Sequence, residues 1–225
     1  MSKRCVAVML AASLLVAACD DDDPTGLSDR ALIRGVNAAP STPSMDVFAD
    51  VPPVVLLGDI AFNSASEDCE AVPEGDLALE VRATGGSSAL ASLTHAFVAG
   101  TSHQLVFFPN QIARLIEDDA EEPPDDVARL RFINATGTTF DVYASPPGTD
   151  AWAPQATLSN VTNASASAFI DVPVENNRIR ITPNTLERLL LDIPALDIPS
   201  DRILTVVITR NAAGAYGFTT AEPCF

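Results

Sequence analysis

An all-β protein is predicted, made of two tandem antiparallel β-sandwich domains, and three observations predict it. Apolar residues alternate with polar ones along short stretches, as in Leu77 to Val81 and Ile179 to Ile181, and this is the period of a strand with one buried face. Turn signals rich in Gly, Pro and Ser follow at close intervals, without a long amphipathic helical pattern. The segment that opens at Arg34 recurs at Arg131, which indicates two copies of one fold.

The first 18 residues have the composition of a secretory signal peptide. A basic head, MSKR, precedes an apolar run from Cys5 to Ala18 that ends on small residues. The run is shorter than the roughly 18 residues that a membrane-spanning helix requires, and four aspartates follow Cys19 directly. We therefore expect residues 1–18 to be cleaved.

The residues VAAC, Val16 to Cys19, resemble the lipobox of bacterial lipoproteins, in which the cysteine is acylated and becomes the first residue of the mature chain. The alternative is an ordinary signal peptide with a chance cysteine at its end. Acyl chains on Cys19 would hold a soluble domain at a bilayer, with residues 19–29 as a polar, disordered tether. The expected location is exported and lipid-anchored, on the periplasmic side of the inner membrane, at the outer membrane or at the cell surface.

The charge of the mature chain excludes several functions. Cleavage removes Lys3 and Arg4 from the 13 basic residues and none of the 30 acidic ones, which leaves 11 arginines, no lysine and a formal charge of 11 − 30 = −19. Such a surface repels nucleic acid and anionic headgroups. We therefore expect no nucleic-acid partner, and contact with the membrane through the lipid anchor alone.

The repeat divides the chain into two domains. RGVNAAPSTPSMDVFAD, Arg34 to Asp50, recurs as RFINATGTTFDVYAS, Arg131 to Ser145. Each copy is long enough for a core of its own, and we place the first over residues 30–116 and the second over 127–225. Residues 117–126, EDDAEEPPDD, have the acidic, proline-bearing composition of a solvated linker.

One segment of the second copy favours a helix. TLERLLLD, residues 185–192, has helical spacing and good helix formers. Its counterpart in the first copy, SALASLTHAFV, follows a Gly-Gly turn and has the pattern of the return strand of a hairpin. Because the two segments are repeats, a strand is expected at both places.

The segment from Arg34 to Asp50 resembles the opening of a bacterial family of domains of unknown function, number 4397. Members begin with Arg-apolar-x-Asn-Ala, followed by a proline-rich loop and Asp-Val-aromatic. The resemblance covers residues 31–218 as two copies, the second with NATGTT in place of the proline-rich loop. It implies exported or surface proteins, often lipoproteins, built of immunoglobulin-like or similar β-sandwich modules, and it carries over no catalytic residue.

Two cysteines remain once Cys5 is cleaved off and Cys19 is acylated. Disulfides persist outside the cytoplasm, so Cys69 and Cys224 are expected to form a bond between the first domain and the C-terminus, with two unpaired thiols as the alternative. No Cys-x-x-Cys or His-Glu-x-x-His spacing occurs, so no metal or other cofactor is predicted. The acidic segments match no EF-hand loop and leave open only weak calcium binding.

Three residue types recur at matching positions of the two copies: Arg34 and Arg131, Asn37 and Asn134, Asp46 and Asp141. We expect structural roles for them. An asparagine where a strand meets a turn bonds nearby backbone amides, and each aspartate can accept from loop amides or pair with one of the arginines. A ligand site made of these residues is the alternative.

No catalytic constellation is visible in the sequence. His95 and His103 are the only imidazoles, and GGSS lacks the second glycine of a nucleophile elbow. We predict a non-enzymatic envelope or surface protein that binds, adheres or scaffolds through its β-sandwich modules, with an unknown protein or glycan as ligand. The alternative is a polysaccharide-active enzyme or its accessory carbohydrate-binding subunit.

Aromatic content separates these two classes. Sugars stack on exposed Trp and Tyr, and Trp152, Tyr143 and Tyr216 are the whole supply, which favours the non-enzymatic class. Trp152, in the loop GTDAWAPQ, is the candidate contact residue, since loops carry function and aromatic residues dominate interface energetics. A tryptophan that caps the sandwich core is the equal alternative.

Overall fold

The protein is all-β in every part that the structure describes. The computed structural model describes residues 30–49, 54–119, 123–124, 126–149, 156–174, 177–184, 188–196, 198 and 202–224. These residues form strands, turns and loops without a helix, which confirms the predicted fold class. Within them, accordingly, no helix could cross a lipid bilayer.

Nine described strands make up the first half of the fold, which we call module 1: β1 (Arg30–Asn37), β2 (Ser44–Ala49), β3 (Val54–Ala61), β4 (Ser64–Ala65), β5 (Glu70–Pro73), β6 (Gly75–Ala83), β7 (Ala89–Phe97), β8 (Ser102–Phe108) and β9 (Ile112–Glu117). The outer sheet of module 1 has the order β3-β2-β6-β7. Its inner sheet has the order β4-β1-β8-β9, with β5 also paired to β1.

The second half, module 2, repeats this pairing with its own nine described strands: β10 (Val127–Ala135), β11 (Phe140–Ser145), β12 (Leu158–Val161), β13 (Ser165–Ala166), β14 (Ile170–Pro173), β15 (Asn177–Pro183), β16 (Leu191–Leu196), β17 (Ile203–Arg210) and β18 (Tyr216–Ala221). The outer sheet is β12-β11-β15-β16, and the inner sheet is β13-β10-β17-β18 with β14 on β10.

Each inner sheet contains one parallel pair, which the sequence pattern did not reveal. β1 runs parallel to β8, and β10 runs parallel to β17. The other strand pairs in the described sheets are antiparallel, as predicted. The parallel pair arises because the first strand of each module lies in the middle of the inner sheet, between β4 and β5 (or β13 and β14) on one side and the final hairpin on the other.

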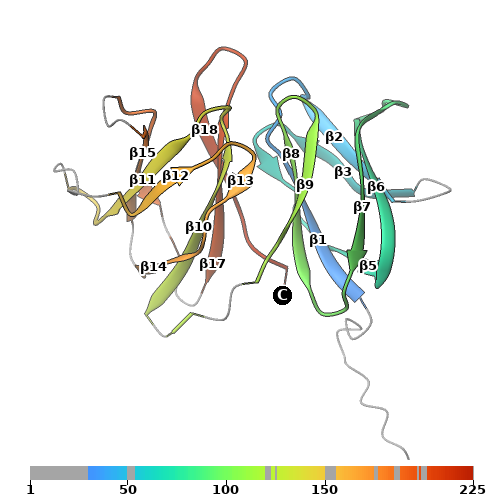
Figure 1. Cartoon of the computed structure of the whole chain (residues 1–225), viewed down its shortest axis with the longest axis horizontal. Helices are drawn as coiled ribbons and strands as arrows, with labels where there is room; N and C mark the ends of the chain where they lie inside the picture. Colours follow the sequence, from blue (N-terminus) through green and yellow to red (C-terminus); the bar gives the residue numbers. More distant parts are fainter. Residues whose placement is uncertain are drawn as a thin grey trace, which may run out of the picture.

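The four sheets are stacked side by side, with the two inner sheets facing each other at the centre (Figure 1). Each module has its own core between its two sheets. A third cluster, the central core, joins the inner sheets and is formed by Val36, Ala38, Val106 and Phe108 of module 1 and by Ile133, Ala135, Ala164, Val207 and Ala221 of module 2. The inner strands therefore have two buried faces.

This two-sided burial explains the composition of β8 and β17. In β8, Leu105 and Phe107 pack in the core of module 1, while Val106 and Phe108 pack in the central core. All seven residues of β8 are buried. A strand that is buried on both faces has an apolar run in place of an alternating pattern, as in LVFF and its counterpart TVVIT.

Two details of the sequence prediction need correction. The strand expected over residues 185–192 is β16, and it begins only at Leu191; residues 188–190 are not in a strand, and 185–187 lie outside the described residues. The linker expected over 117–126 is not solvated throughout. Its first residue, Glu117, ends β9, and the next, Asp118, is buried because it pairs with a buried arginine.

Candidate functional site

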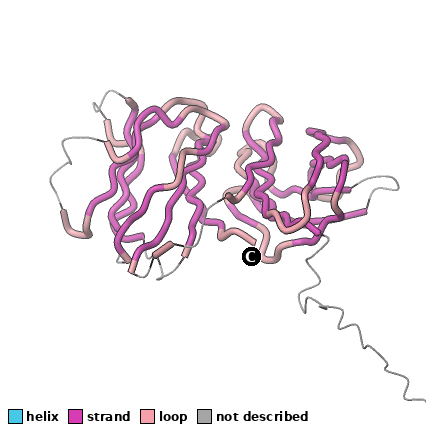
Figure 2. Tube along the Cα trace, turned by 60° about the horizontal axis from the view of Figure 1, so that its bottom comes forward, coloured by secondary structure: helices cyan, strands magenta, loops and turns pink. Residues whose placement is uncertain are grey.

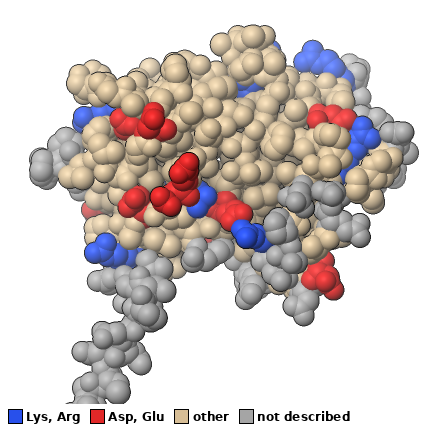
Figure 3. Space-filling model, turned by 180° about the vertical axis from the view of Figure 1, so that it is seen from behind, with Lys and Arg blue, Asp and Glu red and all other residues tan. Residues whose placement is uncertain are grey.

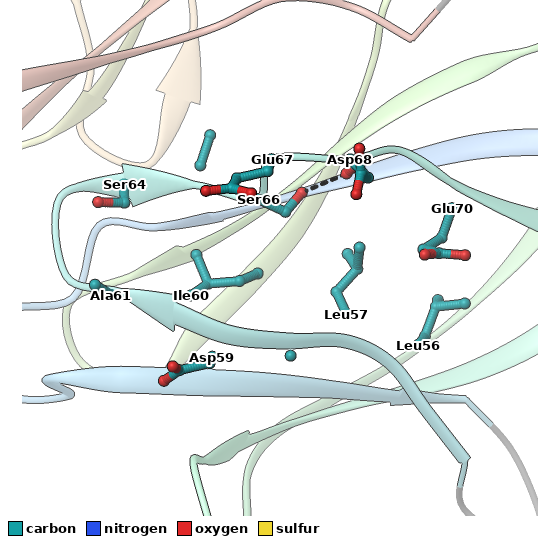
Figure 4. Close-up of a pocket in the computed structure, with 12 residues that line it drawn as sticks. Leu56, Leu57, Asp59, Ile60, Ala61, Ser64, Ser66, Glu67, Asp68 and Glu70 are labelled. Atoms are coloured by element: carbon teal, nitrogen blue, oxygen red, sulfur yellow. Dashed lines mark hydrogen bonds between the residues drawn. The ribbon is translucent and has the colours of Figure 1, made fainter.

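A groove of about 450 Å³ runs along the side of module 1, between β3 of the outer sheet and the segment from β4 to β5 of the inner sheet. Leu57 and Ile60 of β3 lie in its floor, and they are almost fully buried because they also belong to the core of module 1. Figure 4 shows both side chains between the two segments, with Glu70 reaching toward Leu56 and Leu57 from the opposite wall. The groove thus has an apolar floor and a wall that carries carboxylates.

The recurring aspartate of module 1 gives β3 its shape. Asp46 in β2 accepts hydrogen bonds from the backbone N–H of Asp59 at 2.8 Å and from the hydroxyl of Thr84 at 3.0 Å. Asp59 has a φ of 53°, and the β2–β3 register shifts beside it, which is the geometry of a β-bulge. The carboxylate of Asp46 therefore holds a kink in the strand that borders the groove.

The recurring asparagine of module 1 fixes Ile60, the residue that follows Asp59 in β3. The fully buried Asn37 donates to the carbonyl oxygens of Thr42 at 2.9 Å and Ile60 at 3.1 Å, and it accepts from the N–H of Ala39 at 3.1 Å. One side chain therefore joins β1, the proline-rich loop and the groove-forming strand.

Module 2 uses the same two side chains in the same way. Asp141 accepts from the N–H of Asn160 at 2.7 Å, and Asn160 has a φ of 58°. Asn134 donates to the carbonyl oxygens of Thr138 at 2.6 Å and Val161 at 2.7 Å. In both modules the aspartate thus accepts from a backbone amide within the neighbouring strand, β3 or β12, and not from an amide of a loop.

The alternative prediction, that these aspartates pair with the recurring arginines, is wrong. The guanidinium of Arg34 donates to the sulfur of Cys69, at 3.2 Å from Nη2 and 3.4 Å from Nε. Arg131 pairs with Asp118. In both modules the arginine is on the inner sheet, whereas the aspartate is on β2 or β11 of the outer sheet.

The two modules differ at the position beneath the groove. Gly35 and Phe132 are equivalent, since each exchanges backbone and side-chain hydrogen bonds with a matching serine, Ser66 or Ser167. A Cβ on Gly35 would lie 2.4 Å from Cδ1 of Ile60, so Ile60 rests directly on this glycine. In module 2 the phenylalanine ring fills the corresponding space.

The acidic wall is also confined to module 1. Glu67, Asp68 and Glu70 are exposed, and none of them has a basic partner among the ion pairs of the described residues. In module 2, Ile170 of β14 matches Glu70 and Ser167 matches Ser66, and between them the chain has only Ala168 and Phe169 where module 1 has Glu67, Asp68 and Cys69. Figure 3 shows acidic side chains concentrated over the module 1 half of the face seen from behind.

A family model described as a domain of unknown function (DUF4397) matches residues 31–143, half of the chain. The chain belongs to this family. The matched segment runs from β1 through module 1 into β11, so it contains the Arg, Asn and Asp positions of both modules. Membership of module 2 as a second complete copy stays a prediction.

Solved structures similar to this DUF4397 chain include a family 26 carbohydrate-binding module from Eubacterium rectale Amy13K in complex with maltoheptaose (12% identity, 87% of this chain and 98% of that chain, TM-score 0.27). Others are a streptococcal virulence factor described by its α-glucan binding (10%, 78% and 91%, TM-score 0.26) and a putative cell adhesion protein from Bacteroides uniformis (8%, 85% and 96%, TM-score 0.28). No curated protein matches the chain. These TM-scores are too low to support an argument about this chain, so its architecture is described from its own strand pairing.

The two modules of the DUF4397 chain are joined by a buried polar network beside the central core. The guanidinium of Arg131 forms an ion pair with Asp118, whose side chain is completely buried. Ser102 and Gln104 donate to the same carboxylate at 3.1 and 3.2 Å, and Gln104 also donates to Thr205 of module 2 at 3.1 Å. Burial raises the pKa of the Asp118 carboxyl, while Arg131 and these hydrogen bonds act in the opposite direction.

The disulfide joins the two modules next to the polar network around Asp118. Cys69 lies between β4 and β5, Cys224 follows β18, and their Cα atoms are 6.0 Å apart. The N–H of Cys224 donates to Ser102 at 3.0 Å, so the bond is continuous with the polar network around Asp118. Figure 1 shows the C-terminal end of the chain between the two modules.

The two histidines of the DUF4397 chain lie together, which the sequence did not indicate. Their rings are 5.0 Å apart, and Phe97 contacts both at an edge. Nε2 of the buried His103 is 2.9 Å from the Thr101 hydroxyl, while its Nδ1 has no hydrogen-bond partner. Burial and then His95 lower the pKa of His103, and Glu117 opposes them.

The remaining sites expected from the sequence are the lipidated cysteine, the candidate contact tryptophan and any metal site. Cys19 and Trp152 lie outside the described residues. Across the described ranges, no three His, Cys, Asp or Glu side chains are grouped to hold a metal ion.

Proposed function

We propose that this chain is a lipid-anchored, non-catalytic binding protein of the cell envelope, in which two β-sandwich modules form one rigid body that presents the groove of module 1 to a protein or glycan ligand. The observation that carries the proposal is the groove itself, an open channel between β3 and the β4–β5 segment of module 1. Binding sites are typically concave and apolar with a few polar groups at their edges.

Rigidity supports a binding role. The inner sheets share a central core, the disulfide joins residues 155 positions apart, and Asn63 of module 1 donates to the Phe218 carbonyl of module 2 at 2.9 Å and accepts from Thr209 at 2.6 Å. A preorganised site loses less conformational freedom on binding than a mobile one. The recurring Asp46 and Asn37 add to this because they fix the strand that borders the groove.

The sequence supports the anchor. Acylation at Cys19 would leave the tether between the lipid and Arg30, where β1 begins. Ten extended residues reach at most about 35 Å, so the modules would stay close to the membrane on which they are anchored. With a formal charge of −17 for the whole chain, an anionic bilayer repels the modules and leaves the groove accessible.

A matched pair of variants tests the binding role. Ala61 is exposed and lines the groove, so Ala61→Trp would fill the groove without disturbing the core. Thr162 follows β12 at the equivalent place in module 2 and is exposed, so Thr162→Trp is the control. The mature chain is applied to immobilised peptide and oligosaccharide panels, and release of reducing sugar is measured on the same panels.

The expected result is a ligand whose binding is lost in Ala61→Trp and retained in Thr162→Trp, with no reducing sugar released. If both variants retain binding, the binding site lies elsewhere and the proposal that the groove binds the ligand is overturned. Release of sugar by the wild-type chain would favour the polysaccharide-active alternative. Protease treatment of intact cells, with lysed cells as reference, then shows on which side of the outer surface the modules lie.

A further inference from the structure

We propose that the groove of module 1 takes an extended polypeptide segment in which lysine or arginine side chains alternate with apolar ones. This inference rests on the proposed function, because it names the ligand class of the same groove.

Charge complementarity is the first argument. Glu67, Asp68 and Glu70 form a row of exposed carboxylates along one wall, and the ion pairs of the described residues leave all three without a basic partner. Asp171 and Glu222 of module 2, by contrast, are paired with Arg129 and Arg202. A cationic side chain seated along the wall would complete the pairs that the protein itself leaves open.

The shape of the groove is the second argument. Its β3 side extends over residues 56–61, and six residues of strand span roughly 20 Å. β3 is the terminal strand of the outer sheet, so its edge away from β2 is outside the backbone ladder. An extended segment can lie along such an edge. Because successive side chains of an extended segment point to opposite sides, one set can meet the more accessible Leu56 and Ala61 of β3 while the other meets the carboxylates.

The comparison of the two modules is the third argument. The segment from Ser167 to Ile170 matches the segment from Ser66 to Glu70 that carries the acidic wall, and it contains no acidic residue. Phe132 occupies the position of Gly35. Both differences concern the groove, whereas the Asp and Asn side chains that hold the framework are the same in the two modules. Module 2 therefore keeps the same framework and differs from module 1 at residues that border the groove.

A neutral glycan is the other class of ligand that such a protein could bind. Sugar-binding faces rely on aromatic rings for stacking, and none of the described residues that line the groove is aromatic. A groove that is lined by carboxylates and has no aromatic side chain among its described residues favours a cationic peptide over a sugar.

The experiment uses two triple variants with the same change of charge. The groove variant is Glu67→Gln, Asp68→Asn and Glu70→Gln. The control variant is Glu74→Gln, Asp76→Asn and Asp126→Asn, three exposed acids that do not line the groove. The probes are a fluorescent decapeptide of alternating lysine and valine, the matching glutamate–valine decapeptide, and maltoheptaose. Affinity is measured by anisotropy for the peptides and by calorimetry for the sugar, on the full mature chain.

We expect the lysine–valine peptide to bind wild type and control alike and to bind the groove variant about tenfold more weakly, since three exposed ion pairs are lost. Its affinity should fall as salt rises from about 50 to about 300 mM, and amide hydrogen exchange should slow in β3. The inference would be overturned if both triple variants lost the same affinity for the lysine–valine peptide. It would also be overturned if the glutamate–valine peptide bound wild type as tightly as the lysine–valine peptide, or if maltoheptaose bound and the peptide did not. A probe that is lost in Ala61→Trp but not in the groove variant would retain the groove as the binding site and overturn only the ligand class.

Discussion

Asp118 and Arg131 form an ion pair that is buried at the junction between the two modules, one residue beyond β9 and within β10. The guanidinium also donates to the Glu117 carbonyl at 2.7 Å and to the Thr205 hydroxyl at 3.1 Å, and it lies over the Phe169 ring. One arginine thus connects the end of module 1, the first strand of module 2 and the strand paired with it.

Removal of one partner of this pair should strongly destabilise the protein. Asp118→Asn leaves the Arg131 charge buried without a counter-ion, and such changes cost about 3–5 kcal/mol. Urea unfolding of the mature chain measures the loss. Glu222→Gln is the control, because the Arg202–Glu222 pair is about half exposed and should contribute less than about 1 kcal/mol. Equal losses in the two variants would contradict the junction role of Asp118.

Loss of the disulfide should destabilise the protein without unfolding either module. Each module has its own core, whereas the bond closes a loop of 155 residues and removal of such a bond costs about 2–5 kcal/mol. The double variant Cys69→Ser, Cys224→Ala should retain the far-ultraviolet spectrum of the wild type and unfold at lower urea. Wild type in reductant should match it, and an unchanged midpoint in both cases would contradict this expectation.

A methyl group on Gly35 should disturb the floor of the groove. Its Cβ would lie 2.4 Å from Cδ1 of Ile60, and overpacking of this kind costs about 1–3 kcal/mol. Ile60→Val removes that Cδ1 and alone costs about 0.5–1.5 kcal/mol. We therefore expect Gly35→Ala with Ile60→Val to be more stable than the sum of the single changes implies. Strict additivity in urea unfolding would show that the two side chains do not meet.

Acidification below neutral pH should weaken the fold through His103. Its pKa is lowered in the folded chain, chiefly by burial, so the unfolded chain binds the proton more readily. The stability it contributes is present above the unfolded pKa of about 6.5 and is lost as the pH falls below it. The urea midpoint should decline between about pH 7 and 5 more steeply for wild type than for His103→Gln.

Other groups do not obscure this comparison. Both proteins retain Asp118, so its contribution largely cancels in the comparison. Arg178 holds the pKa of the Asp192 carboxyl below its usual value, so that group stays ionised over the same interval. Parallel pH profiles for wild type and His103→Gln would contradict the role assigned to His103.

Local features of the fold were predictable from the sequence. Alternation in segments such as LALEVRA and the turn signals between them predicted strands, and recurrence at Asn37 and Asn134 indicated side chains that bond the backbone. These inferences succeed because a strand period and a turn depend on neighbouring residues.

Most contacts between distant residues, unlike the bond between Cys69 and Cys224, were not predictable. Composition indicated a solvated linker at Asp118, because nothing in EDDAEEPPDD shows that its carboxylate meets Arg131 in another strand. The contact of Ile60 with Gly35 that forms the groove floor likewise joins separate strands. The central core did leave a signal: the uninterrupted apolar runs of β8 and β17 are typical of strands covered on both faces.

The separation of 155 residues between Cys69 in module 1 and Cys224 after β18 of module 2 has a consequence for biosynthesis. If the chain is exported from its N-terminus, as we propose, Cys69 reaches the oxidising compartment first and has no partner there until β18 of module 2 has also been translated and exported. A chain that ends early therefore carries a reduced Cys69, accessible to an oxidoreductase or to a foreign thiol. Closure of this bond reports that both modules have arrived, and quality control in the envelope could distinguish molecules with a complete module 2 from truncated ones by that thiol alone.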